Sequence, residues 1–240
     1  MAGIKPSLVI GQNYKQLNVP EPQIRVSPDT RFLYELQELT TRFEMPCVVG
    51  DHNSDQIVEL LGELSPDIGV ILGARILSKH VINHFRIGII NTHPGLLPEN
   101  RGLDNIPWAV LNGVPQAVTA HLIDSEIDAG TIIQTNICAV KRDDSFVDIA
   151  LRLAEYEQSM MIDSIRILAT ENLLANPGIE WGPYHPPLSK SEASKTVAVF
   201  GEYKANYASI VQRYPELRES AQLVPRPVGL NGGVHQRFDV

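Results

Sequence analysis

The sequence lacks several features that mark particular classes of protein. It has only two cysteines, Cys47 and Cys138, far apart in apolar stretches, so buried free thiols in a reducing compartment are expected rather than a disulfide. No Cys and His residues have zinc-site spacing. No apolar run approaches the ~20 residues that span a bilayer, and the N-terminus has no signal-peptide layout. We therefore expect a cytoplasmic protein with no metal and no membrane partner.

Positive charge is also scarce. Lysine and arginine number 20 against 28 aspartates and glutamates, a formal net charge of −8. Proteins whose main partner is a nucleic acid need clustered basic residues for phosphate contacts, so no nucleic-acid partner is expected. The 240 residues, 43% of them hydrophobic, fit one globular core with a small appendage.

Short apolar runs alternate with helical patterns along most of the chain. This alternation predicts an α/β fold with a doubly wound, mostly parallel sheet and helices on both faces. The domain is expected to cover residues 1–176, followed by a partly irregular C-terminal extension, 177–240, with one helical stretch at 203–214. The expected strands are 6–11, 46–49, 67–72, 87–91, 118–123 and 131–140, and the expected helices are 29–43, 54–64, 78–85, 107–111 and 146–174.

One strand end carries an amide and an imidazole together. Asn91 and His93 follow an apolar run, and side chains at positions i and i+2 of an extended segment point to the same side. Ligands bind at the carboxyl ends of strands in such sheets. Asp128 adds a carboxylate from a separate loop. An amide, an imidazole and a carboxylate are the groups that stabilise and collapse a tetrahedral intermediate in acyl transfer.

Two longer motifs surround these residues and resemble a known family. The first is Asn-x-His-x-x-Leu-Leu-Pro at 91–98 with Arg101 and Gly102, and the second is His121 followed by Asp-Ala-Gly-x-Ile-Ile at 128–133. Together they resemble the folate-dependent formyltransferases, over roughly residues 6–171. The resemblance implies a Rossmann-like fold and transfer of a formyl group from the cosubstrate 10-formyltetrahydrofolate to a primary amine.

The resemblance also implies roles for individual residues. Asn91 would donate a hydrogen bond to the oxyanion, His93 would stabilise that charge or carry the amine proton, and Asp128 would favour the protonated imidazole and orient a relay water. The segment 73–77 and the loop 124–128 would enclose the folate pterin. The folate-binding residues are then expected to be Arg75, Ile76, Leu77, Asp124 and Ile127.

The acceptor amine is less closely defined. The continuation from Pro98 through Arg101 and Gly102 to Trp108 resembles enzymes that formylate nucleotide-linked amino sugars, so these last three are the expected substrate-binding residues. Relatives open with a strand-helix unit whose glycine-rich turn holds the phosphate of glycinamide ribonucleotide, and this sequence starts after it. Methionyl-tRNA formyltransferases carry a basic loop and a C-terminal barrel, which this acidic chain does not match.

Several alternatives stay open. A formyltetrahydrofolate hydrolase would keep the same three catalytic residues, and a non-catalytic folate-binding protein is a further possibility. Trp108 could pack its helix, Arg75 could be a solvated arginine, and His121 could be a structural partner of Asp128 or a core histidine. The sheet edge left uncovered by the absent first strand favours a homodimer.

Overall fold

We describe a computed structural model of the chain, covering residues 3–13, 20–27, 35–73, 76–124, 130–170 and 179–220. Three of the expected site residues, Arg75, Ile127 and Asp128, lie outside the described residues. The start of the expected helix at 29–43 also lies outside them.

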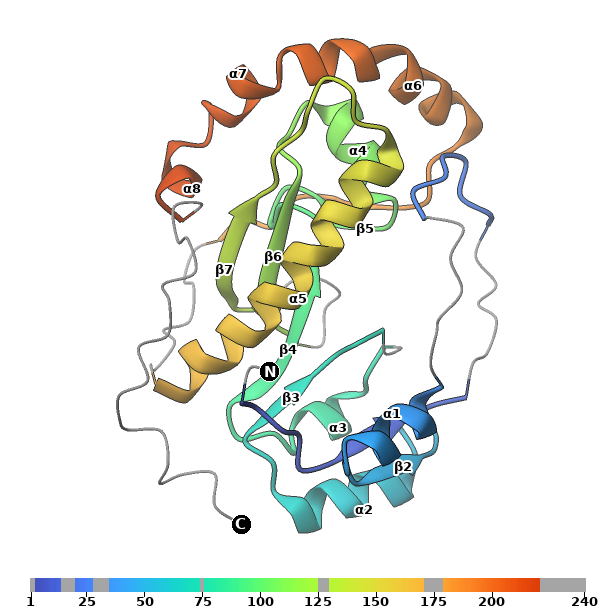
Figure 1. Cartoon of the computed structure of the whole chain (residues 1–240), viewed down its shortest axis with the longest axis vertical. Helices are drawn as coiled ribbons and strands as arrows, with labels where there is room; N and C mark the ends of the chain where they lie inside the picture. Colours follow the sequence, from blue (N-terminus) through green and yellow to red (C-terminus); the bar gives the residue numbers. More distant parts are fainter. Residues whose placement is uncertain are drawn as a thin grey trace.

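The first part of the chain forms a two-stranded parallel sheet with three helices against it (Figure 1). Ser54 begins the second helix as expected, because its hydroxyl accepts a hydrogen bond from the N–H of Ile57. The apolar side chains Ile57, Leu61 and Val81 form a small core there. The elements are β1 (Val9–Gly11), α1 (Leu36–Arg42), β2 (Cys47–Val49), α2 (Asp55–Leu64) and α3 (Lys79–Ile82).

A separate four-stranded sheet forms the centre of the molecule. Its order is β3 (Ile68–Val70), β4 (Gly88–His93), β6 (Ala117–Leu122) and β7 (Ile132–Ile137). The first pair is parallel, as expected, whereas β6 runs antiparallel to both of its neighbours. Strands β6 and β7 are consecutive among the described elements and pair antiparallel, an arrangement that does not require a crossover helix.

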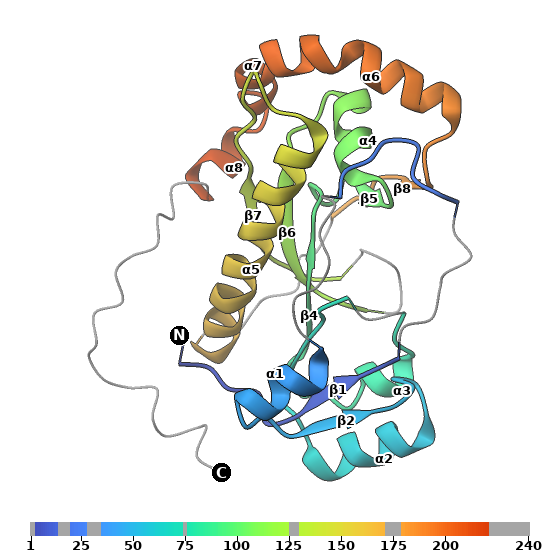
Figure 2. The same ribbon diagram turned by 45° about the vertical axis from the view of Figure 1, so that its right-hand side comes forward.

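The long helix α5 (Phe146–Thr170) lies along β4, β6 and β7 in Figures 1 and 2 and contacts all three strands. Its buried residues Ile149, Leu153 and Met160 pack against Val118 and Ala120 of β6. This is the principal core, and it holds β4 and β6 from one face.

The described residues after α5, 179–220, pack back onto the central sheet. Tyr207 donates a hydrogen bond of 2.6 Å to the carbonyl of Cys138 at the end of β7, and α4 lies against α6 (Figure 2). The elements are β5 (Arg101–Gly102), α4 (Asn105–Asn112), β8 (Tyr184–His185), α6 (Lys190–Ala205), α7 (Tyr207–Val211) and α8 (Pro215–Ser220).

The expected helix at 203–214 was wrong in its boundaries. Helix α6 begins at Lys190 because Ser189 and Glu192 form a capping box, each side chain bonding the other's backbone N–H. Both cysteines are free thiols; Cys138 is buried as expected, whereas Cys47 is only half-buried. None of the described helices is long and apolar enough to span a membrane. Nor do the described residues group three or more His, Cys, Asp or Glu side chains as metal ligands.

Candidate active site

Asn91 lies on β4 directly opposite His121 of β6. Its side-chain nitrogen is 3.2 Å from Nε2 of His121, and Nδ1 of the same ring is 3.3 Å from the carbonyl oxygen of Leu122. The carbonyl can only accept, so Nδ1 carries the proton and Nε2 accepts from Asn91. His121 thereby fixes the Asn91 amide, whose nitrogen has a second N–H to donate.

His93 is held two residues further along the strand. Its side chain is only 4% exposed, and Nε2 donates a 2.8 Å hydrogen bond to the carbonyl of Asn100. In the neutral ring this leaves Nδ1 as the basic nitrogen. A Cβ at Gly95 would lie 2.6 Å from both partners of this hydrogen bond, so only glycine fits beside it.

Thr119 supports the loop that follows His93. Its hydroxyl donates to the carbonyl of Gly95 at 2.9 Å and accepts from the N–H of Leu97 at 3.1 Å, and it is fully buried. Thr119 also lies opposite His93 in the strand pairing. Sequence reasoning missed this residue, because nothing in a threonine on an apolar strand points to a partner across the sheet.

The expected substrate residues Arg101 and Gly102 form β5, which pairs with β8. Gly102 has φ +103°, and a Cβ there would lie 2.3 Å from the carbonyl oxygen of His185, so this close approach requires glycine. The Arg101 guanidinium lies over the ring of Trp181, 5.5 Å from its centroid. The structure therefore joins this loop to a C-terminal segment that sequence reasoning had set aside.

Trp108 lies within packing between α4 and the C-terminal segment. It is 8% exposed, stacks on the ring of His185 at 4.6 Å, and donates through Nε1 to the carbonyl of Pro186 at 2.8 Å. These contacts give Trp108 a structural role in packing α4 against the C-terminal segment. Its expected role in substrate binding stays a prediction.

Glu99 has a distinctive position in the loop between His93 and Arg101. Burial raises the pKa of its carboxyl, and the negative charge of Glu216 raises it further, against a backbone hydrogen bond that lowers it. A half-buried carboxyl with a raised pKa in the loop that follows His93 is a candidate for binding a polar group of a substrate.

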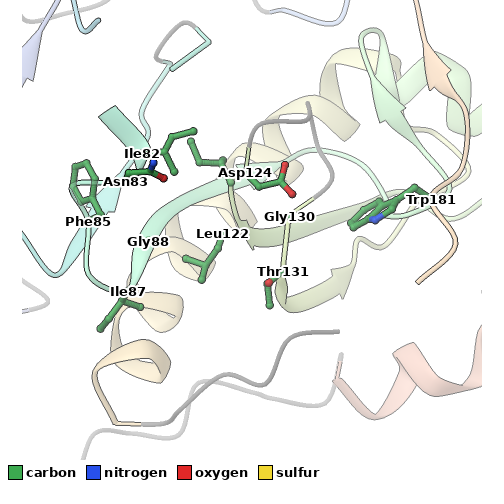
Figure 3. Close-up of a pocket in the computed structure, with 11 residues that line it drawn as sticks. Ile82, Asn83, Phe85, Ile87, Gly88, Leu122, Asp124, Gly130, Thr131 and Trp181 are labelled. Atoms are coloured by element: carbon green, nitrogen blue, oxygen red, sulfur yellow. The ribbon is translucent and has the colours of Figure 1, made fainter. Parts of the chain in front are cut away.

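A cavity of about 500 Å³ opens beside the start of β4 and the end of β6 (Figure 3). Its lining combines apolar side chains with polar groups that make up more of its surface, and among the described lining residues the carboxylate of Asp124 is the only charged group. The lining residues are Ile82, Asn83, Phe85, Ile87, Gly88, Leu122, Ile123, Asp124, Gly130, Thr131 and Trp181.

Of the expected folate-binding residues that the structure describes, Asp124 alone lines this cavity. Ile76 is 74% exposed, and Leu77 packs against the core of α2 and α3. Asn53 holds this segment by accepting from the N–H of Ser78 at 2.7 Å and donating to the carbonyl of Ile76 at 3.0 Å. Arg75 and Ile127 lie outside the described residues, so the whole expected set stays a prediction.

Comparison with known proteins identifies the domain that contains this site. Residues 47–165 match the formyl transferase family model, and they include β4, β6 and the cavity residues other than Trp181. This domain belongs to the formyl transferase family. The family expected from the sequence motifs is thus confirmed.

Sequence relatives include two methionyl-tRNA formyltransferases. The one from Chlorobium chlorochromatii is 30% identical over 130 residues, 54% of this chain and 41% of the relative. That from Syntrophus aciditrophicus is 28% identical over 155 residues, 63% of this chain and 50% of the relative. The chain therefore spans about half the length of the curated relatives it matches.

Solved structures share the fold of the chain. A formyltransferase from Anoxybacillus kamchatkensis, in complex with UDP-4,6-dideoxy-4-formamido-L-AltNAc and tetrahydrofolate, has a TM-score of 0.54 at 19% identity, covering 85% of this chain and 96% of its own. Phosphoribosylglycinamide formyltransferase from Bacillus halodurans has a TM-score of 0.54 at 21% identity, covering 70% and 83% respectively. These likenesses confirm the α/β formyltransferase fold.

Proposed function

We propose that this protein transfers a formyl group from 10-formyltetrahydrofolate to a primary amine. The observation that carries the proposal is the pairing of Asn91 and His93 on β4, each fixed by a separate hydrogen bond. In the reaction the amine nitrogen bonds to the formyl carbon and the bond from that carbon to N10 breaks. The amine loses one proton, and N10 gains one.

Both fixed side chains suit this chemistry. The second N–H of Asn91 can donate to the formyl oxygen as that oxygen gains negative charge, an interaction worth about 3 kcal/mol in comparable oxyanion sites. His93, with Nε2 held by the Asn100 carbonyl, can receive the amine proton on Nδ1. Asp128, outside the described residues, is proposed to favour the protonated His93 ring.

The cavity supports the choice of cosubstrate. Ile82, Phe85 and Leu122 contribute apolar side chains against which a flat heterocycle can pack, and the carboxylate of Asp124 can accept hydrogen bonds from ring N–H groups. Gly88 at its edge and Asn91 are three residues apart on one strand, about 10 Å at ~3.3 Å per residue. A pterin in the cavity could thus extend its one-carbon arm towards Asn91.

We propose a nucleotide-linked amino sugar as the acceptor. The support is the likeness in fold, over most of both chains, to the Anoxybacillus protein crystallised with a UDP-linked formamido sugar. Arg101 and Gly102 on β5 are proposed to contact the sugar or its phosphates, and Glu99 lies in the same loop. The acceptor amine of methionyl-tRNA is the second candidate, because the sequence relatives carry that name. The net charge of −8 favours the sugar.

The test is incubation of the full chain with 10-formyltetrahydrofolate and a panel of UDP- and dTDP-linked amino sugars, with methionyl-tRNA alongside. Mass spectrometry measures the gain of one formyl group by the acceptor. Formylation of an amino sugar supports the proposal, and formylation of methionyl-tRNA alone replaces the acceptor. Release of formate with no amine present would instead identify a hydrolase.

A further inference from the structure

Trp181 lines the cavity although it lies outside the formyl transferase family match. It comes from the short segment before β8, well after Ile137 at the end of the last strand of the central sheet. In the view of Figure 3 its indole ring and the ring of Phe85 lie at opposite ends of the lining, with Asp124 and Leu122 between them. The cavity therefore takes one of its walls from the C-terminal part of the chain.

The position of Trp181 is fixed by the loop that carries the expected substrate residues. The N–H of Gly182 donates to the carbonyl of Pro98 at 3.1 Å, and Nη1 of Arg101 donates to the carbonyl of Gly182 at 3.4 Å. A Cβ on Gly182 would lie 2.7 Å from the Pro98 oxygen, so this contact is close. Arg101 also lies over the indole, 5.5 Å from its centroid.

The two tryptophans of the chain differ in what surrounds them. Trp108 is buried, with its N–H bonded to a carbonyl and its face covered by the His185 ring. Trp181 is only half-buried, and part of its surface lines an open cavity. An indole with this exposure presents an aromatic surface to whatever enters the cavity.

We propose that Trp181 stacks on the ring of the ligand that occupies this cavity, and that Arg101 holds the indole in place for that contact. The ligand class is a flat heteroaromatic ring with N–H groups, because Phe85 and Trp181 offer aromatic faces within an otherwise largely polar lining, and Asp124 supplies a hydrogen-bond acceptor. Its identification as a reduced pterin rests on the proposed function. On this account residues from the C-terminal extension complete the cosubstrate site.

The test uses the full chain, with tetrahydrofolate as the probe. Trp108→Phe leaves Trp181 as the only tryptophan, and Trp181→Phe leaves only Trp108. We expect saturable quenching of indole emission by tetrahydrofolate in Trp108→Phe and none in Trp181→Phe, after correction for absorption with N-acetyltryptophanamide. Quenching confined to Trp108 would overturn the inference.

Kinetics give a second readout. Trp181→Ala should raise the KM for 10-formyltetrahydrofolate about three- to tenfold, and Trp181→Phe by less, with kcat within about twofold in both, because a stacking contact binds the ring without touching the formyl carbon. Circular dichroism checks that both variants fold. If all variants bind tetrahydrofolate equally tightly, the inference about Trp181 is overturned but the proposed function is not. Failure of the unaltered chain to bind tetrahydrofolate would overturn the proposed function as well.

Discussion

Strands β4 and β6 differ sharply from β2 and β3 in how far their apolar side chains are covered. Ile90 and Val118 of the first pair are 0% exposed, whereas Val49 and Val70 of the second are 44% and 39% exposed. The covered pair lies under α5 and carries Asn91, His93 and His121. The difference indicates that the proposed catalytic residues are held by the buried half of the molecule.

The largest expected effect comes from removing core volume beneath β4, the strand that carries Asn91 and His93. Ile90→Ala should lower the free energy of unfolding by about 3 kcal/mol, because the side chain packs with Met161 and Leu168. Urea denaturation measures the loss. Val70→Ala is the control on the exposed strand, with an expected loss below about 1 kcal/mol. Equal losses of unfolding free energy in the two variants would contradict the stated difference in burial between β4 and β3.

A smaller change acts on the site without emptying the core. Gly95→Ala places a methyl group against the hydrogen bond between His93 and Asn100, so turnover should fall about tenfold or more through misplacement of the imidazole. Gly201→Ala is the control, because no atom lies within 4 Å of a Cβ there. The control should leave turnover unchanged and stabilise α6 by about 0.5–1 kcal/mol. Unaltered turnover in Gly95→Ala would show that the close fit has no catalytic purpose.

Helix α5 gives a pH-dependent test of the covered half. Burial raises the pKa of Glu157 to about 7 from its ordinary 4.5. The folded state then binds a proton that the unfolded state releases, so stability is lost as the pH rises through that interval. Glu157→Gln should raise the free energy of unfolding by about 1 kcal/mol near pH 8 and have little effect below about pH 4.5. An equal change in the free energy of unfolding at both pH values would contradict this prediction. Glu155→Gln, at an exposed position on the same helix, is the control.

The smallest effect on stability is expected at the exposed edge. Leu72, next to β3, is 86% exposed, so Leu72→Glu should change the free energy of unfolding by less than about 0.5 kcal/mol. The homodimer expected from the sequence stays a prediction, and light scattering tests it with the same variant. A dimer that Leu72→Glu dissociates supports it. A chain that stays monomeric at every concentration contradicts it.

Much of the fold followed from local patterns. The expected helices starting at Ser54 and Ser78 start there in the structure, because each serine hydroxyl caps the helix through a neighbouring backbone N–H. The direction of β6 was not predicted, since pairing across a sheet depends on how the chain turns rather than on composition. The start of α6 at Lys190 was overlooked, although the sequence Ser-x-x-Glu at 189–192 carries its signal.

The candidate site also contains residues that local sequence patterns predict and residues that only the fold brings together. Asn91 and His93 could be predicted together because strand spacing puts them on one side. Thr119 and Trp181 could not be predicted. Thr119 contacts the loop after His93 from the neighbouring strand, and Trp181 lines the cavity although it is distant in sequence from the other lining residues. The partner of His121 also came only from the fold, since Asn91 faces it by strand register.

The most direct test of formyl transfer at β4 is the turnover of Asn91→Ala and His93→Ala with the acceptor that the panel identifies. Each should lower kcat by about 100-fold or more while circular dichroism shows a folded protein, and His80→Ala, on the exposed surface of α3, should change neither. Turnover near that of the unaltered chain in either site variant would contradict the assignment of catalysis to these two residues.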